Sequence, residues 1–227
     1  MRTRLLAGFC LAMVFASSAR AGEAVQPATS QPQTIVIGLD LSKSNPLVKD
    51  EAYAARAAAR TARELLALPL RSRVMLRTFG SYGGGANGLK VDQVISARAK
   101  PQAVAEGIAA IIAHVPKLVA EGKLEAQGKT NIVPFLETEA EIVDCKAGEV
   151  RVILLTDGFE DSDYATLTRH GGKLPAPDPI YQGCDELMIL GLGQGGGSPA
   201  ATKHLRAAWS AYAEKAGFRR FTGLYDW

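Results

Sequence analysis

Residues 34–44 read TIVIGLDLSKS, and this stretch decides how the rest of the chain is interpreted. Residues 34–39 form an apolar run of the kind found in strands that a sheet buries on both faces. A buried strand commonly ends in one turn residue, but this one is followed by Asp40, Ser42 and Ser44. Because three oxygen-bearing side chains gather at alternate positions, we expect a binding site at the carboxyl end of this strand.

Strand and helix signals alternate along the rest of the chain. Apolar runs predict strands over residues 73–79, 150–156, 187–192 and 218–222, and helical patterns cover residues 46–68, 101–114, much of 117–127, 131–143 and 200–215. Residues 89–96 follow the glycine-rich residues 80–88 (GSYGGGANG), which predicts a hairpin at an edge of the sheet. The alternation predicts an α/β domain over residues 34–227, with a mostly parallel sheet covered by helices on both faces.

The amino-terminal residues have a different character. Arg2 and Arg4 precede an apolar run at residues 5–15, and residues 16–21 (ASSARA) supply the small residues of a cleavage site. This is the layout of a signal peptide, and the run is too short to span a bilayer. We therefore expect a periplasmic or secreted protein without stable membrane insertion. Residues 22–33 are polar and contain proline, which predicts a disordered leader.

Removal of residues 1–21 would change the charge balance. Three arginines and no acidic residue would be lost, so the basic residues would fall from 26 to 23 against 23 acidic ones. A chain without a basic surplus is not expected to bind nucleic acid.

The cysteines point to one disulfide. Cleavage would remove Cys10 and leave Cys145 and Cys184, which in an exported protein most simply pair with each other. Each precedes a predicted strand, so both would lie at the same edge of a parallel sheet. Without a C-x-x-C pattern or a histidine partner they would make a poor zinc site.

Two further residues are expected near the first strand's end. Asp157 ends the strand at residues 150–156 much as Asp40 ends the first, and Thr130 opens the helix at residues 131–143. Ligands of open α/β sheets bind outside the carboxyl ends of the strands. Carboxylates and hydroxyls suit a hard cation such as Mg²⁺, Mn²⁺ or Ca²⁺. Two carboxylates nearly neutralise a divalent ion, and one coordination position would remain for a partner's carboxylate.

These residues resemble the motif of a known family. D-L-S-K-S at Asp40, Ser42 and Ser44, Thr130 in G-K-T-N, and Asp157 in L-L-T-D-G are similar, in this order, to the metal-ion-dependent adhesion site of the von Willebrand factor A domain. The resemblance covers roughly the whole mature chain. It implies a three-layer Rossmann-like fold and a Mg²⁺ ion that binds an Asp or Glu side chain of a protein partner. It does not imply catalysis.

Enzymatic alternatives rest on weaker patterns. A metal-dependent phosphoesterase could use Asp40 and Asp157, but a haloacid-dehalogenase-like phosphatase would need a second Asp where Ser42 stands. No G-x-S-x-G elbow of a serine hydrolase is present, and His170 and His204 have no evident catalytic partner. The segment GLGQGG at residues 191–196 fits a dinucleotide-binding pattern but lies too near the end of the sequence for a full unit. We expect a recognition protein that is not an enzyme; the alternatives are a metal-dependent phosphoesterase that uses Asp40 and Asp157, or a scaffold domain with an unoccupied site.

Two assignments are less settled by the sequence. Thr138 competes with Thr130 as a ligand, although it falls inside the predicted helix. The acidic residues Glu160, Asp161 and Asp163 follow Asp157 closely and could hold a second cation or shape the ligand surface. A solvated loop is the simpler interpretation, because surface loops are commonly polar.

Overall fold

The computed structural model describes residues 31–81, 88–168, 170–196 and 198–227. The predicted signal peptide, most of the predicted leader and most of the glycine-rich segment lie outside these residues. Gln33, the last residue of the predicted leader, is the first residue of a strand.

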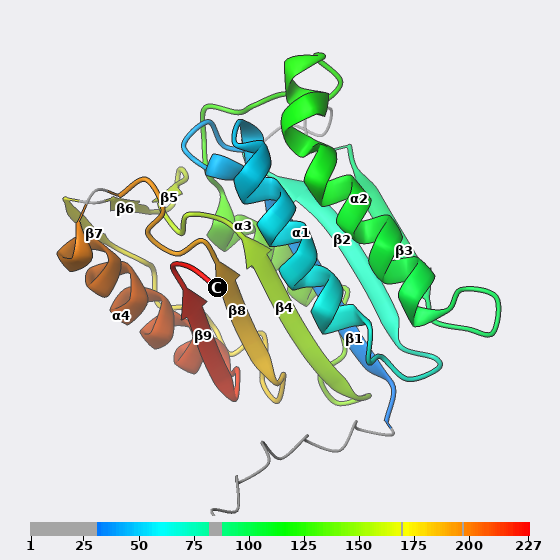
Figure 1. The fold of residues 1–227 in the computed structure, drawn as a ribbon. Helices are drawn as coiled ribbons and strands as arrows, with labels where there is room; N and C mark the ends of the chain where they lie inside the picture. Colours follow the sequence, from blue (N-terminus) through cyan, green and yellow to red (C-terminus); the bar gives the residue numbers. More distant parts are fainter. Residues whose placement is uncertain (1–30, 82–87, 169, 197) are drawn as a thin grey trace, which may run out of the picture.

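A six-stranded sheet forms the centre of the molecule (Figure 1) in the order β3-β2-β1-β4-β8-β9. Neighbouring strands are parallel except for β3, which runs antiparallel to β2 at one edge. The strands are β1 (Gln33–Asp40), β2 (Arg73–Phe79), β3 (Lys90–Val94), β4 (Glu149–Leu155), β8 (Glu186–Leu190) and β9 (Arg220–Leu224). The predicted mostly parallel sheet with one antiparallel edge strand is confirmed.

Helices cover both faces of this sheet, which gives a three-layer Rossmann-like α/β fold (Figure 1). Alternate side chains of β1 enter the two layers of core: Ile35 and Ile37 pack with α1 and α2, and Val36 packs with α3 and α4. The helices are the short 3-10 helix η1 (Pro46–Val48), α1 (Glu51–Leu65), α2 (Pro101–Ala120), α3 (Ile132–Ala140) and α4 (Pro199–Ala216).

The strand order brings two carboxyl ends together. The chain leaves β1 toward β2 on one side, and it leaves β4 toward β8 on the other. β1 and β4 are direct neighbours with Ile37 aligned to Ile153, so their last residues end at the same edge. This is the topological switch point, where open α/β sheets form their ligand sites.

The helix predicted over residues 46–68 is wrong as a single helix. Asn45 caps η1, and Asp50 caps α1. The Asp50 side chain accepts a hydrogen bond from Tyr53 N at 2.9 Å. Two capping residues five positions apart start two helices, because each one satisfies the free N–H groups of its own first turn.

The predicted interruption between residues 114 and 117 is also wrong, because α2 continues through Pro116. Pro116 is buried against the core, and this packing outweighs the backbone hydrogen bond that a proline cannot donate. By length and composition α2 could cross a membrane. Its Val104, Ile108 and Ile112 nevertheless pack in the core that α2 shares with α1, and core helices can have the same composition.

The predicted disulfide is confirmed. Cys145 and Cys184 are bonded, with their Cα atoms 4.7 Å apart, just before β4 and β8 at the amino-terminal edge of the sheet. The covalent loop encloses β4 and the whole segment that follows it.

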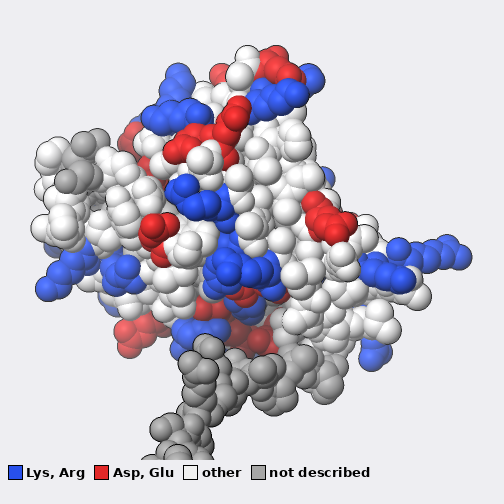
Figure 2. All heavy atoms as spheres, viewed as in Figure 1, with Lys and Arg blue, Asp and Glu red and all other residues white. Residues whose placement is uncertain are grey.

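The long connection between β4 and β8 is not an irregular loop. It contains a small antiparallel sheet of β5 (Glu160–Asp161), β6 (Thr166–Thr168) and β7 (Gly171–Lys173). This sheet lies at the carboxyl edge of the main sheet, beside the ends of β1 and β4 (Figure 1). On the face displayed in Figure 2, basic and acidic side chains are interspersed over a largely uncharged surface.

Candidate functional site

Asp40 is the last residue of β1, and its carboxylate is fixed on both oxygens. Oδ1 accepts a hydrogen bond from Ser42 N at 2.7 Å, and Oδ2 accepts one from the Thr156 hydroxyl at 2.7 Å. The side chain is fully buried. Thr156 follows β4 directly, so this contact joins the ends of the two central strands.

Asn45 holds the same two strand ends through its side-chain amide. Its Nδ2 donates to Asp40 O and to Leu155 O, both at 2.9 Å, and its Oδ1 accepts from Leu47 N at 3.3 Å. Asn45 is fully buried, so these partners replace the water that the amide loses on folding. The sequence interpretation did not single out Asn45 or Thr156.

Asp157 follows Thr156 and is also buried. Its Oδ1 accepts from Phe159 N at 3.0 Å, which closes a tight turn in which Gly158 has a φ of 79°. The Trp209 indole of α4 donates to Gly158 O at 2.8 Å and fixes this turn from behind. The turn is therefore set by one hydrogen bond to the Asp157 carboxylate and one between neutral groups.

The two serines connect the aspartates. The hydroxyl oxygens of Ser42 and Ser44 lie 3.1 Å apart. Hydrogen bonding by Ser42 lowers the pKa of Asp40, and hydrogen bonding by Ser44 lowers the pKa of Asp157. Asp40, Ser42, Ser44 and Asp157 thus form one chain of polar contacts across the switch point.

Burial nevertheless raises the pKa of both aspartates above the ordinary value. For Asp157 the second cause is the negative charge of Asp40, which raises its pKa further. None of the ion pairs formed by the described residues includes either carboxylate. Two like charges are therefore held together in a dry environment without a protein cation, and this arrangement disfavours their ionisation.

Thr130 reaches the site from the connection between α2 and α3. That connection is joined to the serine loop by hydrogen bonds from Lys43 N to Gln127 O and from Gln127 N to Leu41 O, both at 2.8 Å. Thr130 itself pairs with Asp161 of β5 through both backbone groups, at 3.3 and 2.9 Å. The segment carrying Thr130 is held between the serine loop and the small sheet.

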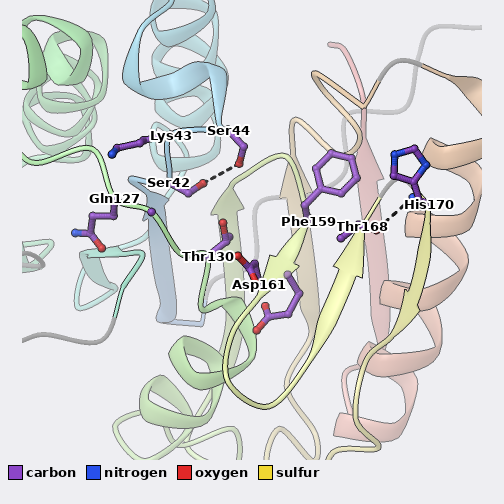
Figure 3. Close-up of a pocket in the computed structure, with 11 residues that line it drawn as sticks. Ser42, Lys43, Ser44, Gln127, Thr130, Phe159, Asp161, Thr168 and His170 are labelled. Carbon is purple, nitrogen blue, oxygen red and sulfur yellow. Dashed lines mark hydrogen bonds between the residues drawn. The ribbon is translucent and has the colours of Figure 1, made fainter.

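Ser42, Ser44 and Thr130 line one pocket with a volume of about 410 Å³. In Figure 3 the serines lie on one side of this pocket, Thr130 and Asp161 in the middle, and Phe159, Thr168 and His170 on the other side. The structure thus brings four of the five predicted ligands into one hydrogen-bonded group and sets the fifth on the same pocket. Thr138 does not compete, because its hydroxyl donates to Pro134 O within α3.

The interpretation of the acidic residues as a solvated loop is wrong for Glu160. Its side chain is fully buried, and its Oε2 accepts from Ile132 N at 2.9 Å and Val133 N at 3.1 Å. Glu160 therefore caps α3, a role that depends on residues nearly thirty positions earlier in the chain. Asp161 forms an ion pair with Lys129 at 3.0 Å, and Asp163 is exposed.

The glycines of the GLGQGG segment are required by packing. A Cβ atom at Gly191 would collide with the Tyr53 hydroxyl, and one at Gly196 would lie 2.8 Å from the ring of Phe159. The described residues of this segment therefore have a structural reason for their glycines. His170 and His204 are both exposed.

The donor set fits a hard divalent cation. Two buried carboxylates and three hydroxyls offer only oxygen ligands, and a cation between them would relieve the repulsion that raises the pKa of Asp157. Among the described residues, no three His, Cys, Asp or Glu side chains are grouped so as to hold a metal ion. A cation here would therefore depend on the hydroxyls and on ligands from outside the chain.

No model of a known protein family matches the chain, and no characterised protein matches its sequence. Among solved structures, the human COPII-coat protein Sec24c is similar over 86% of this chain, with 12% sequence identity and a TM-score of 0.36. The matched region is 30% of the length of that protein. At this TM-score the similarity carries no argument about function, which is therefore inferred from the site alone.

Proposed function

We propose that the mature chain is a divalent-cation-dependent recognition domain of the von Willebrand factor A type. Asp40, Ser42, Ser44, Thr130 and Asp157 would hold Mg²⁺, with Mn²⁺ or Ca²⁺ as alternatives. An Asp or Glu side chain of a protein partner would complete the coordination. The observation that carries the proposal is the pair of buried carboxylates, joined by two hydroxyls at the switch point and left without a cation from the described residues.

The number of oxygen ligands that the site lacks supports a carboxylate as the partner's ligand. A divalent ion between Asp40 and Asp157 would be close to neutral, and the hydroxyls of Ser42, Ser44 and Thr130 would add coordination without charge. A hard cation of this kind prefers six or more oxygen ligands, so the site needs oxygens from water or from a partner. A carboxylate is the strongest such ligand that a protein partner can offer.

The surroundings of Asp40 support recognition over hydrolysis. A carboxylate nucleophile has to reach the reacting atom of its substrate, and Asp40 is fully buried with one hydrogen bond on each oxygen. A small cation needs only the second lone pair that each of these oxygens keeps. The phosphoesterase alternative would require this arrangement to open.

The disulfide and the amino-terminal sequence support an extracytoplasmic setting for the proposed partner. The bonded Cys145 and Cys184 are typical of oxidising compartments, and the amino-terminal sequence resembles a signal peptide. We therefore place the proposed recognition in the periplasm or outside the cell.

The first test is calorimetric titration of Mg²⁺ and Mn²⁺ into residues 22–227 after treatment with EDTA. The wild type should bind one ion, and Asp40→Ala should bind at least tenfold more weakly. Asp163→Asn is the matched control, because it removes an exposed carboxylate from the neighbouring loop. Equal binding by all three proteins, or no binding by the folded wild type, would contradict the proposed metal site.

The second test concerns the partner and uses a displayed library of random peptides. Selection in Mg²⁺ should enrich sequences with Asp or Glu, and these should be lost in EDTA or with Asp40→Ala. Hydrolysis of a general phosphate ester, abolished by the same substitution, would instead favour the phosphoesterase.

A further inference from the structure

Glu160 is a third buried carboxylate beside the proposed metal site. It lines the pocket that Ser42, Ser44 and Thr130 also line. Its side chain is completely buried, although it follows Asp157 by only three residues in a stretch of polar sequence. The motif that indicated the other two carboxylates does not include this position.

One oxygen of Glu160 organises the segment that carries Thr130. Oε2 accepts hydrogen bonds from the first two N–H groups of α3, those of Ile132 and Val133. These groups have no partner inside the helix, and the positive end of the helix dipole favours a carboxylate there. Because Thr130 precedes α3 by two residues, Glu160 fixes its approach to the pocket.

The other oxygen is left without a partner. Within the described residues, Oε1 is buried and accepts no hydrogen bond. The nearby Ser162 hydroxyl contributes to lowering the pKa of Glu160, but it is directed to Ala165 O at 3.4 Å. A buried carboxylate oxygen in this state is costly unless some group from outside the chain completes it.

Electrostatics relate Glu160 to the same site. Burial raises the pKa of Glu160 to about 7, and the charge of Asp40 is among the causes. Asp40 also raises the pKa of Asp157, so Asp40 repels both of the other carboxylates. A cation beside Asp40 would reduce both of these repulsions.

We propose that Glu160 is a positioning residue of the metal site, which holds Thr130 in place through α3 and adds a third negative charge beside the cation. This inference rests on the proposed function, because it concerns the same ion. Glu160 would act around the cation rather than as one of its five protein ligands. Residues in such a position commonly change metal affinity by 10–100-fold when they are replaced.

Glu160→Gln tests the proposal in metal-binding calorimetry with Mg²⁺. The amide oxygen can still accept from α3, but the charge is lost, so the dissociation constant should rise about 10–100-fold. Asp163→Asn should leave it unchanged. The backbone amides of Ile132 and Val133 should stay protected from hydrogen exchange in the metal-free Glu160→Gln protein, which separates loss of charge from loss of the helix cap.

Three outcomes would overturn the proposal. Wild-type affinity in a folded Glu160→Gln protein would overturn it while leaving the proposed function intact. Tyr212→Phe is a comparison, because Tyr212 has a buried hydroxyl near the charge of Glu160. Equal loss of thermal stability in Glu160→Gln and Tyr212→Phe, without a change in Mg²⁺ affinity, would show that Glu160 stabilises the core and not the metal site. Failure of the wild type to bind Mg²⁺ would overturn both proposals. If Glu160→Gln does not fold, Glu160→Asp replaces it: it keeps the charge but shortens the reach to the N–H groups of Ile132 and Val133, so wild-type affinity there would overturn the positioning of Thr130 through α3.

Discussion

Replacement of Asn45 by alanine should destabilise the protein strongly, because this side chain joins the two strand ends that carry the site. It makes three hydrogen bonds in a fully buried position, two as a donor and one as an acceptor. Alanine would leave two carbonyls and the Leu47 N–H without these partners. A buried polar group without a partner costs about 1–3 kcal/mol.

Three such groups would cost about 3–9 kcal/mol if each lost its full share. We expect about 3–5 kcal/mol in the free energy of unfolding, because the Leu47 N–H caps only the short helix η1 and contributes least. This is a large share of the 5–15 kcal/mol that is typical of a domain. The loss should be measured by urea unfolding in EDTA, so that metal binding does not contribute. The slope of the transition should be unchanged, because the same surface is exposed on unfolding.

Asn131→Ala is the matched control for this experiment. Asn131 is also buried and lies near the same edge, but its side chain makes no capping hydrogen bond to α3. Its replacement should cost less than about 1 kcal/mol. A loss below 1 kcal/mol for Asn45→Ala, or equal losses for the two variants, would refute the assignment of Asn45 as the connection between β1 and β4.

Three further predictions concern the same edge and the disulfide. Replacing Cys145 and Cys184 by alanine should lower the free energy of unfolding by about 4 kcal/mol in urea, because the disulfide restricts a 39-residue loop in the unfolded chain. An unchanged midpoint of urea unfolding would show that the disulfide does not stabilise the protein in this way. Thr156→Val removes the hydroxyl that donates to Asp40, so Mg²⁺ affinity should fall at least tenfold in calorimetry, and an unaffected affinity would contradict this role. Folding raises the pKa of Asp40 from 3.8 to about 6 and that of Asp157 from 3.8 to about 7, so the folded state holds protons that the unfolded state releases. Stability in EDTA should therefore decrease as the pH rises from about 4 to about 7, and Asp157→Asn should reduce this decrease in a urea titration series. A stability that rises over the same range in EDTA would show that the two carboxylates are not the dominant titrating groups.

The sequence predicted the site where local pattern and strand direction were sufficient. Asp40, Ser42 and Ser44 lie within five residues of one another, so a single strand end brings them together. Asp157 joins them because parallel neighbours end at the same edge of a sheet. Asn45 and Thr156 were missed because their roles depend on the pairing of β1 with β4, which no local pattern reports.

Glu160 was predicted wrongly for a related reason, because a distant segment decides whether it is buried. Its neighbours Asp161 and Asp163 made a solvated loop the simplest prediction, and Asp163 is exposed. Glu160 is buried because the amino terminus of α3 arrives beside it, and that helix belongs to a distant part of the chain. A buried carboxylate cannot be recognised from sequence unless the donor that stabilises it can be placed as well.

The groups that hold the site differ in kind from the groups that would bind the cation. Asn45 and Trp209 fix the backbone around Asp40 and Asp157 through hydrogen bonds between neutral groups, which do not depend on pH. Thr156 instead holds the Asp40 carboxylate itself and lowers its pKa. The carboxylates themselves repel, and burial strengthens this effect. Such an edge can keep its backbone conformation without a cation while its charges remain unsatisfied. The free energy gained on binding would then come from relief of repulsion within a preformed site, and little of it would be spent on folding the loops.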